Sequence, residues 1–168
     1  MGHLVSHKRL LEVLKYEPLT GEWRWLIDVH GHGGIKRAGD IAGSAVSSRY
    51  LKIGIDGRRY YARRLAVFYM TGRWPTRVDH ANGDTLDCSW ANLREATDSQ
   101  NGANSRRRAD NTSGLKGVHW NRQAQKWQAE ITVNQRKQIL LKSDCPAAAH
   151  FAYLTAADAA FGQFSRAA

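Results

Sequence analysis

A polar stretch late in the chain constrains the fold most. Residues 105–114, "SRRRADNTSG", contain no apolar side chain except Ala109. Such a stretch adds nothing to a buried core, so it divides the 168-residue chain into two small parts. We expect an N-terminal domain at residues 1–104, a basic linker at 105–112 and a C-terminal domain at 113–168.

The first part begins with a helix and a strand. A helix capped by Ser6 is expected to end near Tyr16, because Pro18 follows. The alternating tryptophans of "EWRWLI" (22–27) indicate a strand. The glycine-rich residues 31–43 are expected to form a loop.

A hairpin and a second helix follow. In residues 50–62 apolar side chains alternate with polar or small ones, and Asp56-Gly57 is a favoured two-residue turn. Residues 63–72 have helical spacing and end at Gly72, a natural C-terminal cap. This region is therefore expected to be mixed α and β.

The C-terminal part predicts three strands and one helix. The strands are expected at 116–120, 126–133 and 138–142, with a turn at 134–137. Pro146 can open a helix that continues to Phe161. One face of that helix carries mostly small residues, which would let it lie close to a sheet: Ala149, Ala152, Tyr153, Ala156 and Ala160. The whole chain is thus expected to be α+β, ending in a small three-stranded antiparallel sheet packed on one helix.

Composition points to a polyanionic partner. The net charge is +10 and the pI is near 10.0. Residues 105–168 carry 10 basic and 4 acidic side chains, against 15 and 11 in residues 1–104. Such a surface favours double-stranded DNA, although a positively charged soluble protein is the simpler alternative. Without an apolar run of about 18 residues or a signal peptide, we expect a cytoplasmic protein that contacts no membrane.

Residues 78–101, "VDHANGDTLDCSWANLREATDSQN", concentrate reactive side chains. A neutral histidine such as His80 can take a proton from water. Hard cations such as Mg²⁺ prefer oxygen ligands, which Asp79 and Asn101 could supply. The two cysteines, Cys88 and Cys145, form no CxxC pair, so a structural zinc site is not expected.

The local pattern supports a strand, loop, strand and helix around these side chains. Val78 begins a strand, residues 82–84 turn, and residues 92–96 form a second strand. Thr97 and Gln100 fit a capping box. Asn101 would then lie in the first turn of the following helix.

This segment resembles the HNH family of ββα-metal nucleases, in the version found in phage HNH homing endonucleases. Four motifs carry the resemblance, namely Asp79-His80-Ala81-Asn82-Gly83-Asp84, Asp87-Cys88, Asn92-Leu93-Arg94 and Gln100-Asn101-Gly102-Ala103-Asn104. The resemblance covers roughly residues 8–104, with the core at about 76–104. Upstream, Tyr16, Gly21 and Trp25 resemble the family's lead-in.

The resemblance implies roles for these residues. His80 matches the general base, while Asp79 and Asn101 match the ligands of one Mg²⁺ or Mn²⁺ ion. Asn92 matches the residue that orients the histidine and braces the loop. Asn104 is expected at the helix end or against the DNA backbone.

Two residues depart from the family pattern. Arg63 stands where the family usually has histidine, and Cys88 replaces an asparagine. Arg63 and its neighbour Arg64 can still neutralise phosphate, so both are expected to bind DNA. Cys88 is expected to weaken the hydrogen bonding of its loop.

Residues 113–165 resemble the plant APETALA/ethylene-response-factor DNA-binding domain. The carrying residues are Gly114, Lys116-Gly117-Val118, Trp120, Lys126 to Ile131, the helix from Ala147 to Tyr153, and Phe161-Gly162. The pattern departs at Leu141, Ser143 and Cys145. The resemblance implies a sheet in the major groove, which a β-ribbon fits. With the linker arginines, the expected DNA contacts are Arg106, Arg107, Arg108, His119, Trp120, Arg122, Lys126, Trp127, Arg136 and Lys137.

We therefore expect a metal-dependent DNA endonuclease that needs no small-molecule cofactor. One active site cuts one strand, so a monomer would nick its substrate. The alternative is a non-catalytic DNA-binding regulator derived from such a nuclease, which the changes at Arg63 and Cys88 favour.

Overall fold

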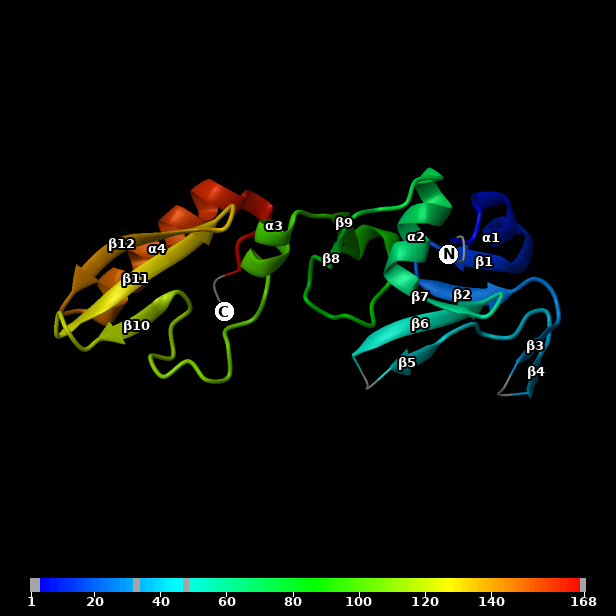
Figure 1. Cartoon of the computed structure of the whole chain (residues 1–168), viewed down its shortest axis with the longest axis horizontal. Helices are drawn as coiled ribbons and strands as arrows, with labels where there is room; N and C mark the ends of the chain where they lie inside the picture. The colour runs from blue at the N-terminus through cyan, green and yellow to red at the C-terminus, as the bar shows by residue number, and fades with distance from the viewer. Residues whose placement is uncertain (1–3, 32–33, 47–48, 167–168) are drawn as a thin grey trace. The chain divides into compact units, whose positions relative to one another are not determined.

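The computed structural model describes residues 4–31, 34–46 and 49–166. The chain divides into two compact units, residues 1–95 and 96–168 (Figure 1). The division falls before the polar linker predicted from the sequence, and each unit is described by itself. None of the helices in the described ranges is long and apolar enough to cross a membrane.

The first unit holds short helices and four small antiparallel sheets (Figure 1). In chain order its elements are α1 (His7–Val13), β1 (Leu14–Glu17), β2 (Glu22–Trp25), β3 (Val29–Gly31), β4 (Gly34–Lys36), β5 (Ser44–Val46), β6 (Tyr50–Ile55), β7 (Arg58–Tyr61), α2 (Ala62–Thr71), β8 (Val78–His80), the 3-10 turn η1 (Trp90–Asn92) and β9 (Leu93–Glu95). The sheets are β1-β2, β3-β4, β5-β6-β7 and β8-β9.

Two predictions for this unit are wrong. The first helix ends at Val13, and β1 pairs with β2, because Leu14 and Tyr16 alternate into the core opposite Trp25 and Trp23. The glycine-rich stretch is also not all loop, since β3 and β4 form a hairpin there. Residues 32 and 33 of that stretch lie outside the described residues.

The second hairpin and helix are confirmed. Asp56 and Gly57 both have positive φ, 48° and 78°, so they form the expected tight turn between β6 and β7. Helix α2 ends at Gly72, whose φ of 68° is left-handed.

One hydrophobic core joins the elements of the first unit. It includes Trp23 of β2, Ile53 of β6 and Leu65 of α2, all almost fully buried. Val78 and Leu93, one from each strand of the β8-β9 hairpin, belong to the same core. Each such burial stabilises the fold by about 1.5–3 kcal/mol, so the hairpin is fixed to the body of the unit.

The second unit is a helix-backed sheet with one short helix before it. Its elements are α3 (Asp98–Ala103), β10 (Val118–Asn121), β11 (Lys126–Val133), β12 (Arg136–Ser143), α4 (Pro146–Phe161) and the 3-10 turn η2 (Gly162–Phe164). The strand order is β10-β11-β12, and α4 runs along one face of the sheet (Figure 1). The turn between β11 and β12 is tighter than predicted: Asn134 and Gln135 both have positive φ, so β12 begins at Arg136.

The buried face of α4 differs in part from the predicted one. Ala149 and Tyr153 are buried as expected, but Ala157 and Phe161 continue the face at a spacing of four residues. Gly117 explains how tightly the helix packs, because a Cβ there would lie 2.1 Å from the Tyr153 ring.

Candidate active site

The β8-β9 hairpin places the Asp-His pair in the first unit. Val78, Asp79 and His80 are all buried, and Asp79 lies opposite Arg94 while His80 lies opposite Leu93. Successive side chains of a strand point to opposite faces, so Asp79 and His80 serve different surroundings from adjacent positions.

The surroundings of His80 hold its imidazole neutral. Its side chain is buried, with only 3% of the residue exposed. Burial, followed by the positive charge of Arg63, lowers the pKa of His80 to about 4, although the carboxylates of Asp79, Asp84 and Asp87 act in the opposite direction. A neutral imidazole at ordinary pH can accept a proton, as a general base must.

Asp79 forms an ion pair across the hairpin. Arg94 donates from Nε and Nη2 to the same carboxylate oxygen of Asp79, at 2.9 and 2.8 Å. Both side chains are largely buried, so this pair is worth more than a surface salt bridge. The sequence analysis singled out Asp79 but missed this partner, which the hairpin register alone reveals.

Asn92 ties the loop after His80 to the second strand. Its Oδ1 accepts a hydrogen bond from the Asn82 backbone N–H at 2.9 Å, and its Nδ2 donates to the Asp87 carbonyl at 2.8 Å. Its own carbonyl accepts from the Ala81 N–H at 2.8 Å. A single buried amide thus fixes both ends of the loop.

The same loop is docked on the β1-β2 hairpin. The Tyr16 hydroxyl donates to the Cys88 carbonyl at 2.6 Å, and the Trp90 N–H donates to the Pro18 carbonyl at 2.8 Å. Gly21 has a φ of 76°, and a Cβ there would lie 2.3 Å from the Cys88 carbonyl carbon. Tyr16 and Gly21, noticed in the sequence only as part of a lead-in, therefore shape the loop beside His80.

Cys88 is buried in the core of the first unit, and burial raises the pKa of its thiol to about 11. The loop keeps its hydrogen bonds despite this residue. Asn82 Nδ2 donates to Asp87 Oδ2 at 2.9 Å, and the Ser89 N–H donates to Asp87 Oδ1 at 3.0 Å.

Arg63 and Arg64 have different surroundings. The Arg63 guanidinium lies over the rings of Tyr50, at 4.5 Å, and Tyr61, at 5.2 Å. Arg64 instead donates to the Pro75 carbonyl at 2.9 Å and lies over Trp74. Sequence reasoning missed the two tyrosines, although their alternation on the predicted hairpin places both on one face.

The chemistry of the donors suits a hard divalent cation held by few protein ligands. Asp79 offers a buried carboxylate, and the neighbouring His80 is neutral. Within the described residues no three His, Cys, Asp or Glu side chains gather in a metal-binding group. An ion at this site would therefore complete its coordination with amide, water or phosphate oxygens.

Asn101 lies in the second unit, on α3. The predicted capping box is present: Thr97 Oγ1 accepts from the Gln100 N–H at 3.2 Å, and Gln100 Oε1 accepts from the Thr97 N–H at 2.8 Å. Helix α3 belongs to the core of its own unit through Ala103, and Asn104 at its end is buried. The metal role of Asn101 stays a prediction.

The register of the C-terminal sheet separates the predicted DNA contacts. Trp120 lies opposite Trp127, with ring centroids 5.2 Å apart, and Trp127 packs against the core under α4. The other face carries His119 and Lys137 around Glu130, with Lys137 Nζ 2.7 Å from its carboxylate.

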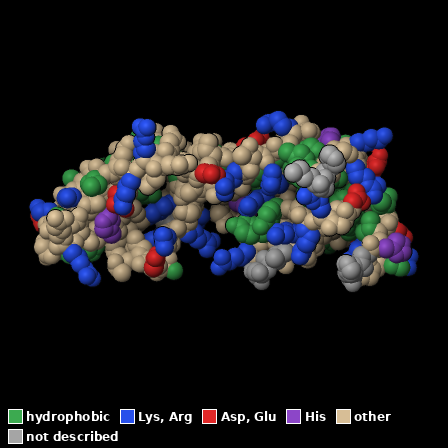
Figure 2. Space-filling view, viewed as in Figure 1, with side chains coloured by type: hydrophobic (Ala, Val, Ile, Leu, Met, Phe, Trp, Pro, Cys, Tyr) green, Lys and Arg blue, Asp and Glu red, His purple; other side chains and the backbone are tan. Residues whose placement is uncertain are grey.

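The remaining predicted contacts lie on loops and strand ends. Arg108 is ion-paired with Asp110 at 2.9 Å, and Lys126 lies 3.3 Å from Asp144. The exposed arginines are Arg106, Arg107, Arg122 and Arg136. Lys and Arg side chains outnumber acidic ones on the visible face of each unit (Figure 2).

Comparison with known proteins agrees with the region of this site. Residues 60–103 match the HNH endonuclease family. Protein 3.8 of Escherichia phage T7 is 30% identical over 89 residues, which cover 53% of this chain and 73% of that protein. No solved structure matches the chain significantly. The chain thus belongs to the family of phage T7 protein 3.8 and carries an HNH endonuclease domain at residues 60–103.

Proposed function

We propose that the chain is a metal-dependent DNA endonuclease of the HNH type. The observation that carries the proposal is the buried, neutral His80 beside Asp79, on a hairpin within the segment that matches the HNH family. In this proposal His80 accepts a proton from water as the water oxygen bonds to phosphorus. The bond from phosphorus to the 3′-oxygen breaks, which leaves a 5′-phosphate and, after protonation, a 3′-hydroxyl.

The other residues of the site position these groups. Asp79 holds the divalent ion, Mg²⁺ or Mn²⁺, and Asn101 is the predicted second ligand. When bound, such an ion stabilises the negative charge that develops on the phosphate. Asn92 fixes the loop that follows His80, and Arg63 adds a positive charge for the phosphate.

The second unit is proposed to hold the DNA. Its three-stranded sheet, its helix and its excess of basic side chains support a domain of the APETALA/ethylene-response-factor type. With one active site per chain, we propose a monomer that nicks one strand. The phage relative favours action in the cytoplasm of an infected bacterial cell.

A plasmid nicking assay tests the proposal. Supercoiled DNA is incubated with wild type, His80→Ala and His7→Ala, in Mg²⁺, in Mn²⁺ and in EDTA. His7 is a matched control because it is a partly buried histidine of the same unit, bonded to the Tyr69 carbonyl. Metal-dependent open circles from wild type and His7→Ala, but not from His80→Ala, are expected. Cutting by His80→Ala at the wild-type rate would rule out His80 as the base.

A non-catalytic DNA-binding protein is the second candidate. The ion pair between Asp79 and Arg94 favours it, because the guanidinium occupies the carboxylate that a metal needs. In that case the wild type binds duplex DNA but nicks neither plasmid nor phage genomic DNA in either metal.

A further inference from the structure

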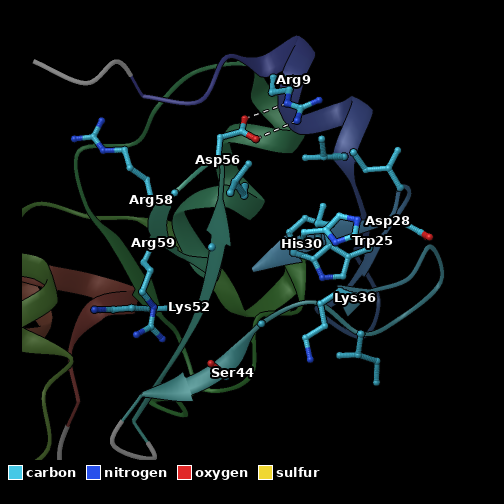
Figure 3. Close-up of a pocket in the computed structure, with 18 of the residues that line it drawn as sticks. Arg9, Trp25, Asp28, His30, Lys36, Ser44, Lys52, Asp56, Arg58 and Arg59 are labelled. Carbon is cyan, nitrogen blue, oxygen red and sulfur yellow. Dashed lines mark hydrogen bonds and ion pairs between the residues drawn. The ribbon is translucent and has the colours of Figure 1, made fainter. Parts of the chain in front are cut away.

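A broad groove of about 1300 Å³ lies in the first unit and is not used by the proposed chemistry. The β3-β4 hairpin and the sheet β5-β6-β7 supply most of its lining (Figure 3). Its basic residues come from separate elements: Lys36 from β4, Lys52 from β6 and Arg59 from β7.

Carboxylates leave these three cations unneutralised. Arg9, at the rim, donates to both oxygens of Asp56 at 3.0 Å, so its charge is already balanced (Figure 3). Among the described residues, no ion pair joins Lys36, Lys52 or Arg59 to an acidic side chain. The groove therefore presents a local excess of positive charge.

Strand register gathers two of the cations on one face. Lys52 lies opposite Tyr61 and Arg59 lies opposite Gly54, which makes Lys52 and Arg59 diagonal neighbours. Like charges at such positions repel and destabilise the sheet. A bound anion between them would remove that cost.

Gly54 keeps the space between the cations open. A Cβ at this position would meet only the Arg58 carbonyl, at an ordinary 3.9 Å, so packing within the protein does not demand glycine. Glycine inside a strand often marks a place where another backbone approaches closely.

The cations continue toward the active site. Lys52 Nζ lies 4.3 Å from the centroid of the Tyr61 ring, and Arg63 lies over the other contacts of that ring at 5.2 Å from the centroid. The charge of Arg63 acts in turn on His80. A polyanion lying along this face would reach the catalytic histidine within the same unit.

We propose that this groove binds the phosphate backbone of duplex DNA through Lys36, Lys52 and Arg59, and leads it toward His80. The inference rests on the proposed function, which makes DNA the ligand. A twisted two-stranded ribbon such as β6-β7 fits the major groove, and evenly spaced phosphates suit cations drawn from several strands. The first unit then binds DNA by itself, in addition to the C-terminal sheet.

The test measures binding without cleavage. Fluorescence anisotropy follows the intact chain in EDTA with a labelled duplex of about 30 base pairs, roughly three helical turns, across a range of salt concentrations. The double variant Lys52→Gln/Arg59→Gln removes two charges from the groove. The control Lys8→Gln/Lys15→Gln removes two exposed charges of the same unit that lie outside it.

The groove variant is expected to bind about tenfold or more weakly at 0.1 M salt, with a salt slope lower by about two, since each lost phosphate contact lowers it by about one. The control pair should keep the wild-type slope. Gly54→Val should fold normally, as judged by circular dichroism, yet bind more weakly. Equal losses in the groove and control variants, or no loss in the groove variant, would overturn the proposal.

The two proposals fail separately. If wild type nicks plasmid but the groove variant binds like wild type, the groove inference fails and the endonuclease stands. If wild type never nicks but the groove variant loses affinity, the endonuclease fails and the groove remains a DNA-binding site.

Discussion

Arg94 directs two N–H groups at one oxygen of the Asp79 carboxylate, at 2.9 and 2.8 Å, across the β8-β9 hairpin. Only 8% of the Asp79 side chain and 17% of the Arg94 side chain are exposed. In the metal-free protein this guanidinium balances the charge of the carboxylate. A bound divalent ion would have to compete with it for that charge.

Removing Arg94 should therefore destabilise the protein and strengthen metal binding. Arg94→Gln leaves a buried carboxylate without its cation, which costs about 3 kcal/mol of unfolding free energy. Mn²⁺ should then raise the Tm of Arg94→Gln more than that of wild type, because the ion replaces the lost charge. Thermal unfolding with and without Mn²⁺ measures both effects.

Arg73→Gln is the matched control for this prediction. It breaks the Arg73–Glu95 ion pair on the same strand, but those side chains are 69% and 40% exposed. Its effect on stability should be below about 1 kcal/mol. Identical Mn²⁺ responses in wild type and Arg94→Gln would count against Asp79 as a metal ligand.

The buried His80 predicts a loss of stability in mild acid. Its pKa is about 4 in the folded protein and near the ordinary 6.5 in the unfolded chain. Between these values the unfolded chain binds more protons, so stability is complete above about pH 6.5 and falls as the pH drops toward 4. Urea unfolding at pH 7 and pH 5 should show a decrease up to about 2 kcal/mol larger in wild type than in His80→Gln. Parallel decreases would mean that His80 is not held neutral.

Arg63 should contribute to the low pKa of His80 through its charge. Arg63→Gln removes that charge, so the pKa of His80 should rise above about 4 but stay below 6.5, because burial is the larger cause. Arg63→Lys keeps the charge and should leave the pKa low. Proton NMR titration of the His80 ring measures both variants, and a rise of equal size in each would contradict the electrostatic explanation.

Asn92 is expected to act on cutting through the loop it holds. Asn92→Asp keeps an acceptor for the Asn82 N–H but places a second oxygen against the Asp87 carbonyl, in place of the 2.8 Å hydrogen bond. The loss of stability should be about 1–3 kcal/mol. The cleavage rate should fall further than DNA affinity, because the loop leads away from His80.

Asn121→Ala separates this effect from general destabilisation. It removes side-chain hydrogen bonds to Gln128 and Ala124 in the second unit, at a comparable cost. If Asn121→Ala slows cutting as much as Asn92→Asp at equal stability, the positioning role of Asn92 is wrong.

Local sequence signals predicted the elements that depend on nearby residues. The Asp56-Gly57 turn, the Gly72 cap and the Thr97–Gln100 capping box all occur as expected, because each depends on a few adjacent residues. Where a longer-range partner decides, prediction failed. Residues 14–17 read as the end of a helix, yet the pairing of Tyr16 with Trp23 makes them a strand.

The candidate site shows the same division. The order of Asp79, His80 and Asn92 was readable from the sequence, since the motif is local. The Arg94 ion pair and the tyrosines under Arg63 depend on strand register. The groove was not predicted at all, because its cations come from three strands that are distant in sequence.

Glu130 is expected to weaken DNA binding by the C-terminal sheet. It is the acidic residue between His119 and Lys137 on the face away from α4, and it holds Lys137 Nζ at 2.7 Å. Glu130→Gln removes a charge that repels phosphate and releases Lys137. If that face lies on DNA, affinity should rise several-fold in the anisotropy assay, up to about eightfold for one added phosphate contact at 0.1 M salt. Asp158→Asn makes the same charge change at an exposed site on α4 and should leave affinity near that of wild type. Equal gains in both variants would show that only net charge matters, and no gain in Glu130→Gln would place DNA elsewhere on the second unit.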